Sequence, residues 1–335
     1  MTMAPRFGVI GAGALGYHHV RLLRDLTGDD FAGFHDRNAE RAASVAADLK
    51  VRAHDSVASL LAECDAVSVV TATTAHHAVA RLAIEAGKHV FIEKPITVTL
   101  AEADELLALA GAQGVLVQVG HVERFNRAVR AAWPHIRGPK FIESDRLAPF
   151  TSRGADVAVV LDLMIHDIDL ILALLESEVT AVDAVGVNVL TPTADIANAR
   201  LTFASGAVAN ITASRVSADR TRKLRIFQPS GYISLDLAAG SGAFFRLREG
   251  LDFATLAKGR GPLAMEAFVE VVPLEAPEGE PLKLELDAFS KAVRGEGPVL
   301  VPGAEGRQAL DVALRVMAAI ERSLPAMTAP AHARA

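Results

Sequence analysis

The stretch Phe7-Gly8-Val9-Ile10-Gly11-Ala12-Gly13-Ala14-Leu15-Gly16 sets the fold that we expect for this chain. The apolar run from Arg6 to Ile10 predicts a buried strand, and the apolar spacing after Gly16 predicts a helix. Between them, G-x-G-x-x-G provides a tight turn, a close backbone approach to a pyrophosphate, and a helix whose N-terminus faces that anion. We therefore predict a dinucleotide-binding turn, with cofactor contacts from Gly11, Gly13, Ala14, Leu15 and Gly16.

Asp36 follows the predicted strand Phe31–His35 and stands 20 positions after Gly16. A carboxylate at this place can accept hydrogen bonds from the adenosine ribose and repels a 2′-phosphate, so we expect NAD rather than NADP. Arg37 beside it can accommodate such a phosphate, which keeps NADP open as the less favoured cofactor.

Further short apolar runs alternate with helical patterns up to residue 120, which is typical of parallel strands joined by crossover helices. Beyond it, strand-like runs follow one another. We predict an α/β Rossmann domain with a doubly wound parallel sheet over residues 1–120. An α+β domain with a mainly antiparallel open sheet is predicted over 121–325, and a frayed tail over 326–335. The expected strands are Val51–Ala53, Ala66–Val70, His89–Ile92 and Val115–Val119, then Val179–Leu190, Ala197–Phe203, Val208–Val216, Leu224–Gln228 and Tyr232–Leu237.

Composition excludes several other classes of protein. The 335 residues are 51% hydrophobic and 22% charged, as in globular proteins, and the net charge of -6 argues against nucleic acid as a partner. The single cysteine, Cys64, cannot form an intrachain disulfide and is expected to be packed rather than reactive. No signal peptide precedes the first strand, and ionisable residues interrupt the apolar run 157–175, so we expect a cytoplasmic protein without a membrane span.

Glu93-Lys94-Pro95 ends the apolar run Val90–Ile92, so a buried strand is expected to deliver charged side chains at its carboxyl end, where open α/β sheets bind ligands. Taken alone, the triplet also fits a surface turn. A second group, Asp162 and His166, lies four residues apart on a predicted helix, so the two side chains project from one face. A solvated polar stripe and a metal site are the alternatives for this helix, although no further cluster offers a complete set of metal ligands.

In this order, the glycine turn, Glu93-Lys94-Pro95 and the Asp162-x-x-x-His166 helix resemble the Gfo/Idh/MocA family of NAD(P)-dependent sugar and polyol dehydrogenases. The resemblance implies that Lys94, Asp162 and His166 are catalytic and that Glu93 lies near the nicotinamide ribose. Thr71, Glu93 and Lys94 join the predicted cofactor contacts. The chain departs from the family where Ala155-Asp156-Val157-Ala158 replaces the glycines that often precede the aspartate helix.

Within the family, the segments 120–126 and 161–169 are similar to the branch that oxidises the 3-hydroxyl of UDP-N-acetylglucosamine. This likeness implies a nucleotide-sugar substrate. Its predicted contacts are Lys94, Arg124, Asn126, Asp162 and His166. A diphosphate calls for guanidinium groups, and the candidates are Arg124, Arg146, Arg153 and the arginines between Arg215 and Arg225.

Three alternatives remain open at this point: a dehydrogenase of inositol or a free sugar, a catalytically silent NAD(P)-binding regulator, and a metal-dependent hydrolase. The ordinary pKa of histidine suits a general base better than that of lysine, so we expect His166 to take the proton and Lys94 to polarise the hydroxyl, with Asp162 orienting the group. The reverse assignment stays open. Alternating Val185, Val187 and Val189 predict an apolar sheet face that a second copy of the chain would cover, and the family resemblance implies a homodimer or homotetramer.

Overall fold

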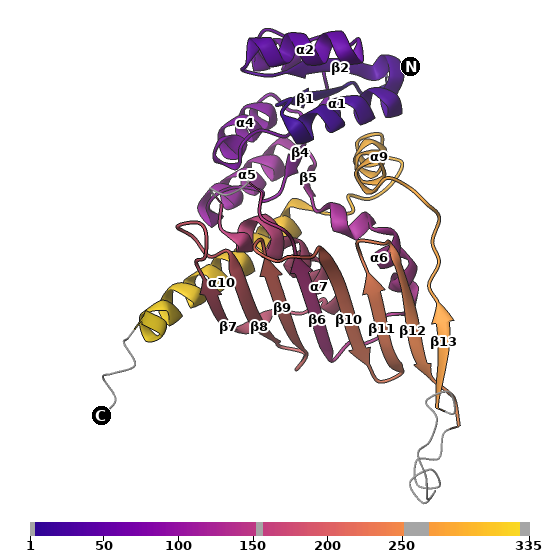
Figure 1. Cartoon of the computed structure of the whole chain (residues 1–335). Coiled ribbons are helices and arrows are strands. Elements are labelled where there is room, and N and C mark those ends of the chain that lie inside the picture. Colours follow the sequence, from indigo (N-terminus) through magenta and orange to yellow (C-terminus); the bar gives the residue numbers. More distant parts are fainter. Residues whose placement is uncertain (1–3, 152–156, 251–267, 329–335) are drawn as a thin grey trace, which may run out of the picture. The chain divides into compact units, whose positions relative to one another are not determined.

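The computed structural model describes residues 4–151, 157–250 and 268–328, and it divides into two compact units (Figure 1). The first unit comprises Met1–Phe125 and Gly279–Asp311, and the second comprises Asn126–Glu278 and Val312–Ala335. Arg153, Ala155, Asp156 and the end of the tail, 329–335, lie outside the described residues. Within the described ranges, no helix combines the length and apolar character needed to cross a bilayer.

A five-stranded parallel sheet forms the first unit, in the order β2-β1-β3-β4-β5. This confirms the predicted Rossmann fold. The run Val51–Ala53 differs from expectation, because it contributes a single bridge between Ala53 and Phe34 instead of a full strand. The strands are β1 (Phe7–Ile10), β2 (Phe31–His35), β3 (Ala66–Val69), β4 (His89–Glu93) and β5 (Val117–Gly120).

Helices pack on this sheet through aromatic and aliphatic side chains. Phe289 of α9 meets Phe7 of β1 and Phe91 of β4 edge-on, with ring centroids 6.4 and 5.7 Å away. Side chains of α1, α2 and α9 thus share one core with β1. A capping box opens α5, where Thr99 accepts from the Glu102 backbone and Glu102 accepts from the Thr99 backbone. The helices are α1 (Ala14–Thr27), α2 (Ala39–Leu49), α3 (Val57–Leu61), α4 (Thr73–Glu85), α5 (Leu100–Gln113) and α9 (Pro281–Val293), with short turns η1 (Gly28–Asp30) and η2 (Val122–Phe125).

The second unit is built on an eight-stranded sheet in the order β13-β12-β11-β10-β6-β9-β8-β7. All neighbouring pairs are antiparallel except β6 and β9, which confirms a mainly antiparallel sheet. Three strands, β6, β12 and β13, were not among those expected from the sequence. The strands are β6 (Phe141–Leu147), β7 (Val179–Val187), β8 (Ile196–Phe203), β9 (Val208–Ser214), β10 (Thr221–Gln228), β11 (Gly231–Asp236), β12 (Ser241–Leu247) and β13 (Val269–Pro273).

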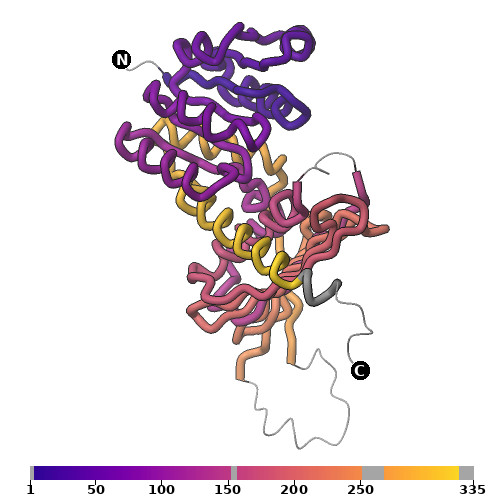
Figure 2. The backbone as a smooth tube through the Cα atoms, turned by 90° about the vertical axis from the view of Figure 1, so that its left-hand side faces the viewer, coloured from indigo at the N-terminus to yellow at the C-terminus, as the bar shows by residue number. Residues whose placement is uncertain are grey.

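One face of this sheet is buried beneath helices. Alternate residues such as Ile142, Leu201 and Ile211 are fully buried there. The last helix lies along the sheet at β7 (Figure 2). Arg315 donates to the Val179 carbonyl at 2.9 Å, and Ile320 packs on Gly186. The helical elements are α6 (Arg127–Ala132), η3 (Trp133–His135), the π-helical turn η4 (Val160–Met164), α7 (Ile165–Leu175) and α10 (Gly303–Thr328), which contributes to both units.

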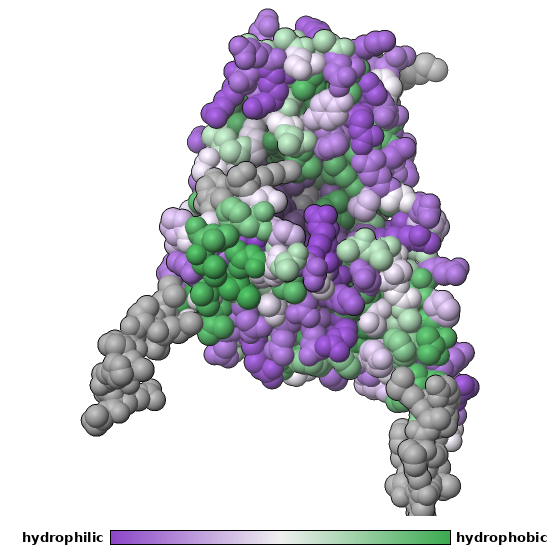
Figure 3. Space-filling model, viewed as in Figure 1, coloured by the Kyte–Doolittle hydropathy of each residue, from purple (hydrophilic) through white to green (hydrophobic). Residues whose placement is uncertain are grey.

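The opposite face carries a row of aromatic rings across four neighbouring strands. Phe141, Phe227, Tyr232 and Phe245 stand in register, with successive centroids 5.7, 5.5 and 4.5 Å apart. At one edge of the sheet, hydrophobic side chains are exposed over β7 and the residues that follow it (Figure 3). They include Val185, Val187, Val189 and Leu190.

Candidate active site

In the glycine turn, a Cβ would have space at Gly13 but would clash at Gly11 and Gly16. Gly11 has φ +95°, and a Cβ there would lie 2.6 Å from the Val70 carbonyl oxygen. A Cβ on Gly16 would lie 2.1 Å from the Gly11 carbonyl oxygen. Gly13 differs, because no atom of another described part of the chain comes within 4 Å of its would-be Cβ. The middle glycine and the first N–H groups of α1, at Ala14 and Leu15, therefore form a turn suited to an anionic ligand.

Asp36 is held at this turn by backbone N–H groups. Its carboxylate accepts hydrogen bonds from Ala12 at 2.7 Å and from Asn38 at 2.8 Å, and the Arg41 guanidinium lies 3.4 Å away. Burial alone would raise the pKa of Asp36, but these three partners bring it below its ordinary value. The carboxylate is thus ionised at neutral pH. Arg37 is exposed, and it is Arg41, which the sequence analysis missed, that faces the carboxylate.

Thr71 follows β3 beside the same turn, since its backbone nitrogen lies 3.1 Å from the would-be Cβ of Gly11. Its carbonyl oxygen is 3.1 Å from Nε2 of His76. The other ring nitrogen of His76 lies 2.9 Å from the Pro95 carbonyl oxygen. Burial lowers the pKa of His76 below its ordinary value, although both carbonyls and Glu93 act in the opposite direction. His76 therefore connects the segment after β3 with the segment after β4.

Glu93 ends β4 as a buried carboxylate, only 7% exposed. One of its oxygens lies 3.1 Å from Nε2 of His19, and the other accepts a hydrogen bond from the Lys94 backbone. Burial by itself would raise the pKa of Glu93, but His19 and the charge of Lys94 lower it below its ordinary value. Gly120 makes room for this carboxylate, because a Cβ there would lie 2.9 Å from it. Lys94 follows, half-buried, at a cis bond to Pro95.

His19 and Ser68 complete this network, and the sequence analysis missed both. The His19 ring is fully buried on α1, with Nδ1 2.8 Å from the Ser68 hydroxyl of β3. Donation from Nε2–H to Glu93 and acceptance by Nδ1 from Ser68 is one tautomer that satisfies both contacts. The sequence signal was weak, because a histidine on an amphipathic helix usually indicates core packing.

In the second unit, the predicted helix begins with a π-helical turn. Asp162 lies in η4, and His166 is the second residue of α7. Both side chains are partly accessible, whereas their neighbours Met164 and Ile165 are fully buried. Single π-helical turns within helices occur frequently at functional sites. The structure thus places Asp162 and His166 at a helix irregularity that the sequence did not reveal.

A buried ion pair fixes α7 to the sheet. Asp167 accepts from Nε of Arg146 at 2.6 Å and from Nη2 at 3.1 Å, and it also accepts from the Ser144 hydroxyl at 2.9 Å. Both charged residues are at most 3% exposed. Arg146 was a candidate for contact with a diphosphate, but its guanidinium is engaged with Asp167 inside the unit.

Several other predicted polar residues also serve the local structure. Asn126 caps α6 by accepting from the Ala128 N–H at 3.0 Å and donates to the Leu237 carbonyl at 2.8 Å. Arg124 belongs to the first unit, where its guanidinium pairs with Glu305. Arg215 is buried and donates to the Val157 carbonyl just before η4. These contacts do not test a role in substrate binding, which remains a prediction.

Asp195 holds the hairpin loop between β7 and β8 beside the start of η4. Its carboxylate accepts from the backbone N–H groups of Val189, Leu190 and Thr191 at 2.8, 2.6 and 2.9 Å. Burial alone would raise the pKa of Asp195, but these bonds lower it to about 2. The Ala194 carbonyl in turn accepts from Val159, which ties the loop to the residues that lead into η4.

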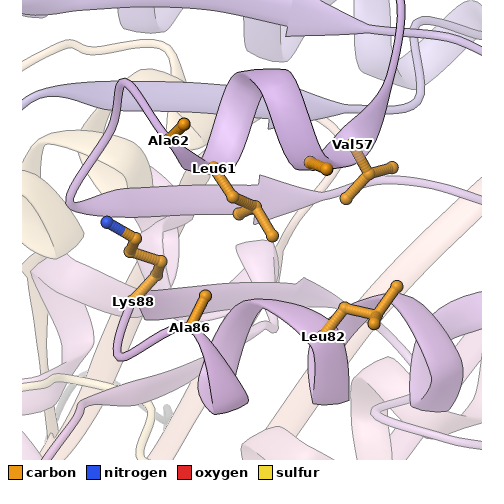
Figure 4. A pocket seen from close by; sticks show the side chains of 7 residues that line it. Val57, Leu61, Ala62, Leu82, Ala86 and Lys88 are labelled. Carbon is orange, nitrogen blue, oxygen red and sulfur yellow. The ribbon is translucent and has the colours of Figure 1, made fainter.

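A shallow apolar pocket of about 470 Å³ lies elsewhere in the first unit, between α3 and the end of α4 (Figure 4). Leu61 and Leu82 face each other across it, and Lys88 lies at its border. It contains no predicted site residue, and we assign it no ligand. Cys64, close to α3 in the chain, is buried, and burial raises the pKa of its thiol to about 12, so a packing role fits better than a nucleophilic one.

Comparison with known proteins gives consistent results for both parts of the chain. Residues 5–121 match the oxidoreductase family with an NAD-binding Rossmann fold, and residues 118–234 match the GFO/IDH/MocA C-terminal domain. UDP-N-acetylglucosamine 3-dehydrogenase of Acidithiobacillus ferrooxidans is 39% identical over 95% of this chain and 98% of its own length. A solved structure of that enzyme has a TM-score of 0.87 at 38% identity, covering 96% of this chain and all of that one. The NAD(+)-dependent scyllo-inositol 2-dehydrogenase of Bacillus subtilis is 27% identical over 96% of this chain and 95% of its own length.

Proposed function

This chain belongs to the Gfo/Idh/MocA family of oxidoreductases, and from that membership we propose that it oxidises the 3-hydroxyl of UDP-N-acetylglucosamine to a ketone with NAD. The observation that carries the proposal is the 39% identity, over 95% of the chain, to an enzyme named for that reaction. The joint presence of Lys94 and His166 supports an active enzyme over a silent regulator, which need not retain both.

Cofactor binding is assigned to the edge of the first unit where Gly13, Asp36 and Thr71 lie. The open Gly13 and the start of α1 suit a pyrophosphate, and the ionised Asp36 suits ribose hydroxyls while opposing a 2′-phosphate. Bound NAD would supply the hydride acceptor. We propose NAD over NADP on this basis, although Arg37 and Arg41 near Asp36 lessen the preference.

Three residues have separate roles in removing the proton from the alcohol. His166 accepts the hydroxyl proton, Lys94 stabilises the developing negative charge on oxygen, and Asp162 orients the polar group on η4. The buried Glu93 supports the half-buried Lys94, because its carboxylate accepts the Lys94 backbone N–H and remains ionised. The reverse assignment, with Lys94 as the base, is decided by the pH profiles of the variants below.

Oxidation of a panel of sugars by the purified protein tests the proposal. Absorbance at 340 nm with NAD should rise with UDP-N-acetylglucosamine, and inositols, free hexoses and other UDP-sugars should react at least tenfold more slowly. Turnover of an inositol without turnover of the UDP-sugar would replace the proposal with the inositol alternative, which the 27% identity to an inositol dehydrogenase supports. The same absorbance measurements are repeated with NADP in place of NAD.

We also propose that the protein self-associates through the aromatic row and the exposed valines of the second sheet. Val185 and Val187 are 48% and 41% exposed on β7, and exposed apolar side chains grouped in this way are commonly covered by a partner. Light scattering at micromolar concentration should give a dimer or tetramer, and a monomeric mass would contradict the proposal. Val185→Lys with Val187→Lys should shift the distribution toward monomer.

A further inference from the structure

His76 connects two backbone segments that follow neighbouring strands of the first sheet. The ring is 1% exposed near the start of α4. Its Nδ1 lies 2.9 Å from the Pro95 carbonyl oxygen, and its Nε2 lies 3.1 Å from the Thr71 carbonyl oxygen. A buried side chain that contacts two carbonyls on separate segments limits how far either segment can move.

The two segments carry different parts of the proposed reaction. Thr71 lies against the glycine turn, and Pro95 directly follows Lys94. We infer that His76 is a positioning residue for the oxidoreductase reaction, which holds the cofactor segment through Thr71 and the Lys94 turn through Pro95. This inference rests on the proposed roles of Thr71 and Lys94.

The chemistry of imidazole allows the two connections to be separated. Because burial lowers the pKa of His76, the ring is neutral at neutral pH and has one N–H. It therefore donates to the two carbonyls in turn, through its two tautomers, and only an imidazolium would donate to both at once. The amide nitrogen of asparagine can occupy nearly the position of Nδ1, and that of glutamine nearly the position of Nε2. His76→Asn should therefore keep the bond to Pro95 and lose the one to Thr71, while His76→Gln should do the reverse.

The test measures cofactor affinity and turnover separately in both variants. NADH fluorescence titration should show affinity weakened about tenfold in His76→Asn and within about threefold of wild type in His76→Gln. Turnover with the sugar found by the panel should fall at least about tenfold in His76→Gln, with a smaller fall in His76→Asn. His77→Gln is the matched control, because His77 is the next residue on α4 and pairs with Glu105. It should leave both quantities unchanged.

Equal losses in the two variants, or a lower melting temperature with affinity and turnover unchanged, would overturn the inference. NADH titration needs no sugar, so a wrong substrate affects only the turnover measurement. If the variants do not fold, nitrogen-15 spectra of the wild-type histidines provide the measurement. The His76 ring signals should shift when NADH is added while those of His77 do not, and an unchanged His76 would also overturn the inference.

Discussion

The Glu93–Lys94 turn of the first unit and the His166–Asp167 segment of the second have the same local arrangement of residues, but the group that holds the carboxylate differs. In each, a proposed catalytic residue is adjacent in sequence to a buried carboxylate that is held by a cation or a ring N–H. Neighbouring residues point in different directions on strands and helices, so burial of the carboxylate turns the functional side chain away from the core. Glu93 is held by an imidazole, however, and Asp167 by a guanidinium.

This difference between the two partners indicates which segment can adapt to a change of charge. A guanidinium keeps its charge at every physiological pH, so Arg146 with Asp167 forms a permanent internal pair. An imidazole can bind a carboxylate in either charge state, so the contact between His19 and Glu93 tolerates a change of protonation nearby. We expect the second segment to be the more rigid support and the first to adjust to the charge around Lys94.

Removing the functional side chains while keeping both carboxylates should have the largest effect. His166→Ala should lower turnover by roughly 10²- to 10⁴-fold and abolish the ionisation on the acidic limb of the pH profile, with NAD affinity nearly intact. Lys94→Ala should be similarly severe but retain that ionisation in its residual rate. An acidic limb that survives in His166→Ala and disappears in Lys94→Ala would exchange the two roles.

Breaking the pair of Arg146 and Asp167 should cost more stability than disturbing the contact between His19 and Glu93. Asp167→Ala leaves the buried guanidinium without its carboxylate and should lower the free energy of unfolding by about 3–5 kcal/mol, as measured by denaturant titration. The paired change Asp167→Leu with Arg146→Met removes both charges and should recover most of that loss. If Asp167→Ala is as stable as wild type, the pair of Arg146 and Asp167 is not the rigid support that we expect.

The imidazole contact should prove weaker. His19→Gln should lower the free energy of unfolding by about 1–2 kcal/mol, because one hydrogen bond to a charged group is disturbed while the helix is kept. His18→Gln is the matched control, since His18 is exposed on the same helix. If both variants lose the same amount, the contact between His19 and Glu93 contributes nothing specific.

Asp36 offers a third buried carboxylate, held mainly by backbone N–H groups, and its replacement should have the smallest effect. Asp36→Ser should weaken NAD binding and shift the ratio of kcat/KM for NADP over NAD by roughly tenfold, equivalent to about 1.4 kcal/mol. The carboxylate that opposes a 2′-phosphate is then gone, while Arg37 and Arg41 remain. A wild-type protein that already prefers NADP would show that Asp36 does not select the cofactor.

Local patterns were enough to predict the fold class and the position of the glycine turn. The turn depends on a few consecutive residues, and parallel strands such as β4 are nearly continuous apolar runs. Strand β6 was missed because Phe141–Leu147 carries Glu143, Asp145 and Arg146, which read as a solvated segment. It lies instead at the middle of the sheet, where Arg146 is neutralised by a helix residue 21 positions later.

The supporting residues of the candidate site could not be read from the sequence for a related reason. The roles of His19, Ser68 and His76 depend on partners elsewhere in the chain. Ser68 and Glu93 lie 49 and 74 residues from His19, and Thr71 and Pro95 lie 5 and 19 residues from His76. The π-helical turn at Asp162 leaves no signature in the hydrophobic spacing either. The side chains proposed to bind or react were therefore accessible to motif analysis, whereas His19, Ser68 and His76 were not.

The return of α9 to the first unit has a consequence for how the chain is made. Leu286 and Phe289 belong to the same core as Phe7 and Phe91, yet the ribosome adds them only after the entire eight-stranded sheet. Part of one face of the Rossmann sheet therefore stays uncovered until α9 has been synthesised. An exposed apolar face of this kind can bind chaperones or associate prematurely. A fragment that stops at residue 125 would lack Leu286 and Phe289, so we expect it to expose the part of the core that these side chains cover.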